Sequence, residues 1–247
     1  MRKLIKGIVD FRQHVRPDYK ETFARLALGQ APDCLFIACS DSRVVPHLFA
    51  STEPGDLFVT RNVGNLVPPC GPDGIVDGDE AEAAAIEYAV LTLRVRDIIV
   101  CGHSACGAMR AILDGAGNAL DADGTQNANR TVSTAGPSTS AASAAPYLTR
   151  WLRHGVPALE KLQAGRRLNP DLPPHDILSQ LNVLEQMAHV ASYPAVAERA
   201  RAGTLGIHGW WFDIAGADVY AYEPALDRFV VIDEEEAERL LASLPDA

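Results

Sequence analysis

The chain has 247 residues, of which 47% are hydrophobic, so it is long and apolar enough to bury a full core as a single domain. It carries 22 Lys and Arg residues against 32 Asp and Glu residues, a formal net charge of -10, and it has no basic stripe. This balance disfavours nucleic acid and anionic membrane surfaces as partners, because both attract positive charge. We therefore expect small-molecule partners.

The first residues predict amphipathic helices rather than a secretion signal. Apolar side chains recur there at roughly helical spacing, and a second helical pattern follows Pro17. Charged residues interrupt the apolar run, and no later run of about eighteen uncharged apolar residues follows. The five cysteines, an odd number thinly spread, suit a reducing compartment and metal binding better than a disulfide framework. We expect a soluble, cytoplasmic protein.

Strand and helix patterns alternate along the chain, which is typical of a parallel sheet flanked by helices. The sequence predicts an α/β fold with a central, mostly parallel sheet of about four parallel strands plus an antiparallel edge strand. The predicted strands are 34–38, 57–61, 97–101 and 205–212, followed by a terminal β-hairpin at 219–222 and 229–232. Helices are predicted near Pro46 and at 79–91, 108–113, 147–162 and 176–190.

Residues 114–146 interrupt this pattern. They are rich in Gly, Ala, Asn, Ser and Thr and contain almost no large apolar side chain. Such a segment cannot bury enough surface to offset its ordering entropy, so we interpret it as a low-complexity surface insertion in one domain spanning 1–247. The apolar stripe of 176–190 is interpreted as core, and His208 as a hydrogen-bonded structural histidine.

Two short motifs at the ends of buried strands carry the candidate chemistry. The first is Cys-Ser-Asp-Ser-Arg at 39–43, and the second is Gly-His-Ser-Ala-Cys-Gly at 102–107. Ligands of α/β folds gather outside the carboxyl ends of the strands. His103 and Cys106 are three residues apart and can meet one ion at the start of a helix. With Cys39 they form a set of two thiolates and one imidazole, which favours zinc and leaves one tetrahedral position open, as in catalytic sites.

Asp41 and Arg43 alternate with Cys39 along the first motif. If the chain is still extended there, all three side chains point to the same side. Taken alone, a cysteine at a strand end is usually a small buried hydrophobe, and an Asp-x-Arg pair is usually a structural ion pair. The presence of both motifs at strand ends favours a functional site.

Together the motifs at 39–43 and 102–107 resemble those of the β-class carbonic anhydrases, and the segment 53–65 between them also resembles that family. The resemblance runs from about residue 19 to about residue 233 and lapses in the insertion. It implies the family's fold, with N-terminal helices that pack on a partner subunit. It also implies a zinc enzyme, a carbonate dehydratase that converts carbon dioxide reversibly to bicarbonate and a proton.

The resemblance supports the ligand set and extends it to a mechanism. One Zn2+ per chain would be held by Cys39, His103 and Cys106, and a zinc-bound hydroxide would attack carbon dioxide. Asp41 would accept the remaining hydrogen of the hydroxide and aim its lone pair at the substrate. Arg43 would keep Asp41 ionised and hold it with a fork of donors.

The substrate pocket follows from the plant-type, or type I, branch of the family. Its pocket positions are matched here by Gln30, Phe58, Val63 and Tyr88. The Gln30 amide can donate to a substrate oxygen, and the other side chains make an apolar wall suited to a nonpolar gas. In the family, part of this lining comes from the neighbouring subunit, so we expect a homodimer or a higher homo-oligomer.

The other branch of the family has a noncatalytic bicarbonate site made by a tryptophan, a tyrosine and an arginine. That site stabilises a closed form, in which the aspartate replaces the water on zinc. The equivalent residues here are Phe36, Phe212 and Arg61, so the indole and phenol donors are missing. We therefore expect Asp41 to pair with Arg43 and to leave zinc open at neutral pH.

Two alternative functions remain open at the level of sequence. One is hydrolysis of carbon disulfide or carbonyl sulfide on the same fold. The other is a noncatalytic zinc-binding or anion-binding module. The presence of Asp41, Arg43 and Gln30 argues against the module, because metal storage requires none of them.

Overall fold

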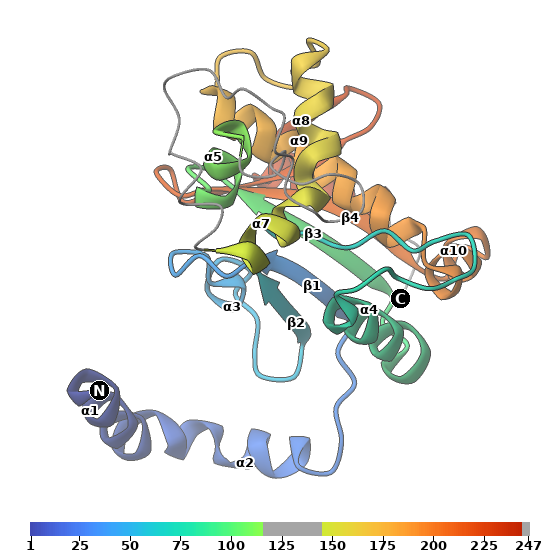
Figure 1. Cartoon of the computed structure of the whole chain (residues 1–247). Coiled ribbons are helices and arrows are strands. Elements are labelled where there is room, and N and C mark those ends of the chain that lie inside the picture. The colour runs from blue at the N-terminus through green and yellow to red at the C-terminus, as the bar shows by residue number, and fades with distance from the viewer. Residues whose placement is uncertain (116–144, 244–247) are drawn as a thin grey trace.

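The computed structural model describes residues 1–115 and 145–243. Its strands form one six-stranded sheet in the order β2-β1-β3-β4-β5-β6 (Figure 1). Strands β1 to β4 pair in parallel, whereas β5 and β6 are antiparallel. The strands are β1 (Cys34–Cys39), β2 (Leu57–Asn62), β3 (Asp97–His103), β4 (Gly206–Asp213), β5 (Asp218–Glu223) and β6 (Arg228–Val231).

The predicted α/β sheet with four parallel strands is confirmed, with one correction at its edge. The C-terminal hairpin contributes two antiparallel strands rather than one edge strand. This arises because β5 pairs with β4, and β6 then extends the sheet by pairing with β5.

The predicted helices are present, and two further ones occur in the described residues near the C-terminus, α10 and α11. The predicted insertion at 114–146 falls almost entirely outside the described residues. The α-helices are α1 (Arg2–Asp10), α2 (Arg16–Leu26), α3 (Pro46–Phe49), α4 (Glu80–Glu87), α5 (Gly107–Leu113), α7 (Pro146–Leu152), α8 (Val156–Gln163), α9 (Pro174–Ala191), α10 (Pro194–Arg201) and α11 (Glu234–Ser243). Short π- and 3-10 turns adjoin them as η1 (Phe11–Val15), η2 (Tyr88–Leu93) and η4 (Arg153–Gly155).

Local sequence explains where the helices around the sheet begin and end. Helix α4 has Glu80 and Glu82 in its first turn, where carboxylates interact favourably with the helix dipole. It continues into η2 and stops at Arg94, whose φ of 56° is left-handed. Helix α9 has Pro174 in its first turn, where a missing N–H leaves no helical hydrogen bond unmade.

Alternate residues of β1 point to opposite faces of the sheet, and both faces are buried. Leu35 and Ile37 join the core that packs beneath α4, α9 and α10. Phe36 and Ala38 lie on the other face, where Phe49 of α3 packs. A strand buried on both faces has a continuous apolar sequence, which explains the run at 34–39.

The sheet brings the two sequence motifs together. Strands β1 and β3 are neighbours, with Ala38 opposite Cys101, and they end at Cys39 and His103. Helix α5 then begins directly after Cys106. The motifs therefore meet at the carboxyl ends of two adjacent parallel strands, as the sequence predicted.

Helices α1 and α2 stand apart from the sheet (Figure 1). No residue of α1, η1 or α2 is buried. Their exposed apolar side chains are those of Leu4, Ile5, Ile8, Val9, Phe11, Val15 and Phe23. An apolar surface of this kind indicates contact with another surface. In the part of the chain that the structure describes, no helix is long and apolar enough to cross a bilayer.

The close approach of β3 to α9 gives a stability prediction. A Cβ added at Gly102 would lie 2.7 Å from Val183 Cγ2 and 3.3 Å from the Ser179 backbone oxygen. We expect Gly102→Ala to lower the free energy of unfolding by about 1–3 kcal/mol, because overpacking strains the core. Denaturant unfolding of the metal-free protein at fixed concentration measures this. Gly107→Ala is the control, because its added Cβ would meet no described residue within 4 Å. Equal stability of the two variants would contradict the prediction.

Candidate metal centre

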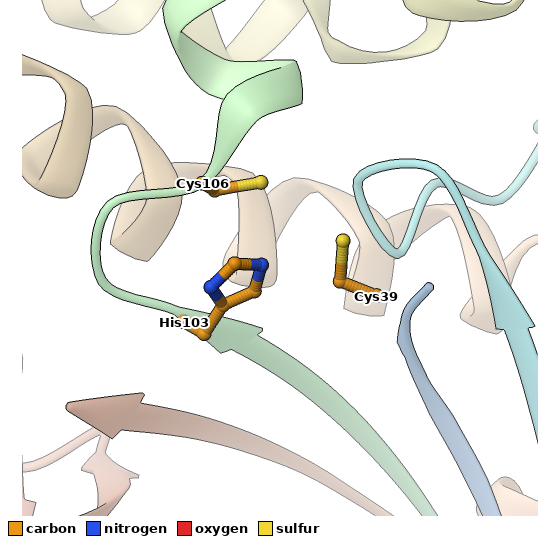
Figure 2. A group of neighbouring side chains, drawn as sticks. All are labelled: Cys39, His103 and Cys106. Atoms are coloured by element: carbon orange, nitrogen blue, oxygen red, sulfur yellow. The ribbon is translucent and has the colours of Figure 1, made fainter. Parts of the chain in front are cut away.

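Three buried side chains converge at the ends of β1 and β3. The ligating atoms of Cys39, His103 and Cys106 all lie within 4.8 Å of one another. Figure 2 shows the two sulfur atoms and the imidazole ring turned toward a common point. The three residues are at most 5% exposed. The cluster is therefore a buried donor set of two sulfurs and one nitrogen, as the sequence predicted.

The imidazole of His103 is oriented for metal binding. Its Nδ1 lies 2.9 Å from the Ser104 carbonyl oxygen, so Nδ1 carries the proton and donates it. Its Nε2 is buried and has no hydrogen-bond partner among the residues that the structure describes. A buried polar atom without a partner costs free energy, and a metal ion on Nε2 would remove that cost. The donor set and this lone pair fit a zinc ion.

The two thiols interact with each other. Each thiol is the largest influence on the other: their proximity lowers the pKa of Cys39 and raises the pKa of Cys106. The backbone N–H of Gly64 donates to Cys39 Sγ at 3.4 Å and also favours the thiolate. One thiolate is thus already favoured at Cys39, and thiolate is the form that binds a metal.

Asp41 and Arg43 form a bidentate ion pair beside the cluster. Arg43 Nε donates to Asp41 Oδ1 at 2.9 Å, and Nη2 donates to Oδ2 at 2.7 Å. This pair holds the pKa of the Asp41 carboxyl well below its usual range. Arg43 Nη2 also lies 3.3 Å from the Ala105 carbonyl oxygen, so the guanidinium links the two motifs.

The geometry of this pair differs from the extended arrangement that the sequence suggested. Strand β1 ends at Cys39, and the Val44 N–H donates to the Asp41 carbonyl oxygen at 3.0 Å in a turn. The Arg43 N–H donates back to Asp41 Oδ1 at 3.0 Å. A turn, rather than strand alternation, brings Asp41 and Arg43 together.

Comparison with known proteins assigns this centre to a family. A profile described as carbonic anhydrase matches residues 34–219, which include all three candidate ligands. A carbonic anhydrase of Pseudomonas aeruginosa is 37% identical over 245 residues, covering 99% of this chain and 98% of its own length. The structure of the β-carbonic anhydrase CcaA superposes with a TM-score of 0.78 at 34% identity, covering 96% of each chain.

The chain belongs to the β-class carbonic anhydrases. It is an enzyme of reversible carbon dioxide hydration with a Cys-His-Cys zinc site, as the sequence predicted. Tetrameric β-carbonic anhydrases of Sordaria macrospora have a TM-score of 0.65 at 28% identity, covering 89% of this chain and 95% of theirs.

Phe36 and Phe212, the two positions compared above with a bicarbonate site, carry apolar rings. Phe36 and Phe212 are buried, and Phe49 packs on both, with ring centroids 6.0 Å and 4.8 Å away. Arg61 is directed to the backbone: its Nε donates to Cys39 O at 3.0 Å and its Nη2 donates to Asp41 O at 2.6 Å. Arg61 therefore supports the turn that carries Asp41.

The four predicted pocket residues lie at two different ends of the sheet. Val63 directly follows β2, whose last residue Asn62 pairs with Cys39, so Val63 lies near the metal ligands. Phe58 is near the start of β2, opposite Leu35, and its ring lies 5.8 Å from that of Tyr88. Gln30 precedes β1 and lines a groove with Leu26 and Gly55. The structure thus brings only Val63 to the metal centre of its own chain.

Several other predictions concern residues outside the cluster. His208 Nε2 lies 2.7 Å from Asp97 Oδ1, which confirms a hydrogen-bonded structural histidine. The helix at 176–190 was interpreted only as core, yet Asp176, Ser179 and Asn182 of α9 contact the metal-ligand segments. No sequence signal singles out these three residues, because the same helix carries further polar residues such as Gln180, Glu185 and Gln186.

The cluster predicts a specific metal requirement. Purified protein is expected to hold about one zinc ion per chain, and Cys106→Ser to hold much less, because two donors bind zinc far more weakly than three. Atomic absorption after exhaustive dialysis measures the ratio. Cys70→Ser is the matched control, since Cys70 lies outside the cluster and is half-buried. Full zinc retention by Cys106→Ser would show that Cys106 is not a ligand.

Proposed function

We propose that this chain is a zinc-dependent carbonic anhydrase of the plant-type branch. In this proposal Asp41 stays paired with Arg43, and the fourth zinc position is open at neutral pH. The observation that carries the proposal is the bidentate Asp41–Arg43 pair beside the unpartnered Nε2 of His103. Both carboxylate oxygens of Asp41 accept hydrogen bonds from Arg43. Replacing a water on the metal would break these bonds, so the paired form is favoured.

Zinc held by the Cys-His-Cys cluster would supply a Lewis acid that makes water nucleophilic near neutral pH. The side chains that would act on the attacking water come from the motif at 39–43. The Asp41 carboxylate accepts a hydrogen bond from the attacking water. This orients the water so that the free lone pair of its oxygen points toward carbon dioxide. Arg43 holds both carboxylate oxygens in place, and Arg61 holds the Asp41 carbonyl. The direction of attack is set before the substrate arrives.

The buried rings of Phe36, Phe49 and Phe212 support the open form. Bicarbonate bound near Phe36 and Phe212 would need donors for its oxygens, and phenyl rings have none. Burying an anion among apolar rings without such donors is costly. The proposed enzyme therefore lacks the anion that would stabilise a closed form, and its Arg61 is occupied by backbone oxygens.

The pocket of each active site is proposed to be shared between two chains. Strand β1 advances about 3.3 Å per residue, so its first residue, Cys34, lies about 17 Å from Cys39 at its other end, and Gln30 precedes Cys34 in the chain. Phe58 and Tyr88 lie at that same far end. We infer that these three side chains complete the site of a partner subunit, while Val63 serves its own. The partner would also cover the exposed apolar side chains of α1 and α2.

The pH dependence of turnover tests the open form. Stopped-flow carbon dioxide hydration by the zinc-loaded protein, from about pH 6.5 to about pH 9, should show turnover already near pH 7. Asp41→Ala should lower kcat/KM by roughly 10²–10⁴-fold, because the attacking water loses its acceptor. Activity confined to high pH would contradict the open form. If the protein hydrates no carbon dioxide at any pH but turns over carbonyl sulfide or carbon disulfide, its substrate is that sulfur compound instead.

Mixed dimers test the shared pocket. Gln30→Ala and Asp41→Ala chains, each weakly active alone, are co-expressed with different tags and purified as the mixed species. If Gln30 acts on the partner's site, one site of the mixed dimer has both residues intact, and about half of the wild-type activity returns. If Gln30 acts within its own chain, both sites stay defective. The same tandem purification of two wild-type chains is the control for assembly.

A further inference from the structure

Helix α9 presents a row of buried polar side chains to the metal centre. The α9 polar row consists of Asp176, Ser179 and Asn182, which are three residues apart and therefore share one face of the helix. Their exposed fractions are only 7%, 2% and 1%. Burying polar groups is costly unless each one has a partner, so the partners indicate what the row does.

Asp176 holds the residue between two of the ligands. The Ala105 N–H donates to Asp176 Oδ1 at 2.6 Å, and Ala105 lies between His103 and Cys106. The φ of Ala105 is 54°, a left-handed conformation that costs free energy in a residue with a Cβ. A charge-assisted hydrogen bond to Asp176 offsets this strain. Asp176 thereby stabilises the bend that turns His103 and Cys106 toward each other.

Ser179 holds the ligand His103 itself. Ser179 Oγ donates to the His103 carbonyl oxygen at 2.8 Å, and Trp211 Nε1 donates to Ser179 Oγ at 3.1 Å. Because Oγ accepts from the indole, its own hydrogen is directed to His103. This contact needs α9 close to β3, and the missing side chain of Gly102 allows that approach, since a Cβ there would lie 3.1 Å from Ser179 Oγ.

Asn182 holds the loop that contacts the third ligand. Asn182 Nδ2 donates to the Gly64 carbonyl oxygen at 3.2 Å, and the Gly64 N–H donates to Cys39 Sγ. Gln186 Nε2 donates to Asn182 Oδ1 at 3.0 Å, which fixes the orientation of the Asn182 amide. Gln186 Oε1 also accepts from the Val67 N–H at 2.8 Å. The end of the row thus supports the donor to the Cys39 sulfur.

We propose that Asp176, Ser179 and Asn182 are positioning residues of the metal centre, which together set the spacing of its three ligands. Each member of the row binds a different backbone segment: the bend between His103 and Cys106, His103 itself, or the loop that donates to Cys39. This inference rests on the proposed zinc at that cluster. Preorganised ligands bind a metal more tightly, because less conformational freedom is lost on binding.

A purely structural role for the row makes a different prediction. Losing a buried hydrogen bond would then lower only the stability of the metal-free protein. A positioning role also changes metal affinity and the geometry of the bound metal. Zinc affinity is therefore measured by chelator competition, and geometry by the visible and charge-transfer absorption of the cobalt(II)-substituted protein. Stability of the metal-free form is recorded in parallel.

The variants are Ser179→Ala and Asp176→Ala, with Asp176→Asn as a conservative rescue because it keeps an acceptor oxygen. Each loss variant is expected to weaken zinc affinity roughly 10–100-fold and to alter the cobalt spectrum. Asp176→Asn should lie between Asp176→Ala and the wild type. The matched control is Ser192→Ala near the other end of α9: Ser192 Oγ donates to His189 O at 2.6 Å and accepts from Cys70 N at 2.8 Å.

The outcomes separate this inference from the proposed function. Weaker metal binding in the loss variants with wild-type affinity in Ser192→Ala supports positioning, whether or not the wild type hydrates carbon dioxide. Unchanged affinity and cobalt spectra in the variants overturn it, even if the wild type is fully active. If Ser179→Ala fails to fold, the Asp176→Ala and Asp176→Asn pair decides by the same two measurements.

Discussion

The constraint on which this structure depends is a buried imidazole nitrogen that has no partner in the described part of the chain. His103 Nε2 is buried at the end of β3, and its other ring nitrogen is committed to a backbone oxygen. Leaving such an atom unpaired opposes folding, and a metal ion bound to it would offset that cost. Two cysteines supply the remaining donors. The parallel pairing of β1 with β3 brings Cys39 and His103 to the same edge of the sheet.

Most of the fold could be predicted because its central strands are apolar and regularly separated by helices. The runs at β1 and β3 indicate burial on both faces, which identifies them as inner strands. The sequence did not indicate whether the terminal hairpin adds one strand or two to the sheet. That depends on the pairing of β5 with the exposed edge of β4, which the sequence pattern does not show. Helix α10 was also missed, because a short, charged segment after Pro194 has little apolar periodicity.

The site could be predicted in its chemistry but not in its geometry. Cys39, His103 and Cys106 follow from donor type and spacing. The Asp41–Arg43 pair was expected, but the turn that forms it was not. The pattern of alternating residues does not show where a strand ends. The α9 polar row was hidden for a related reason. A buried serine or asparagine has a function only through its partner, and the backbone partners of the row are 71 to 118 residues away in the chain.

The separation of the pocket residues along β1 and β2 constrains how two subunits could meet. Gln30 and Phe58 lie where these strands begin, and the ligands lie where they end. Under twofold symmetry, a contact from the start of one chain's strand to the end of its partner's is always matched by the reciprocal contact. Strand β2 lies at an edge of the sheet, with its neighbour β1 on one side only. One symmetric interface along this edge would therefore complete two pockets at once and would also protect an otherwise exposed strand.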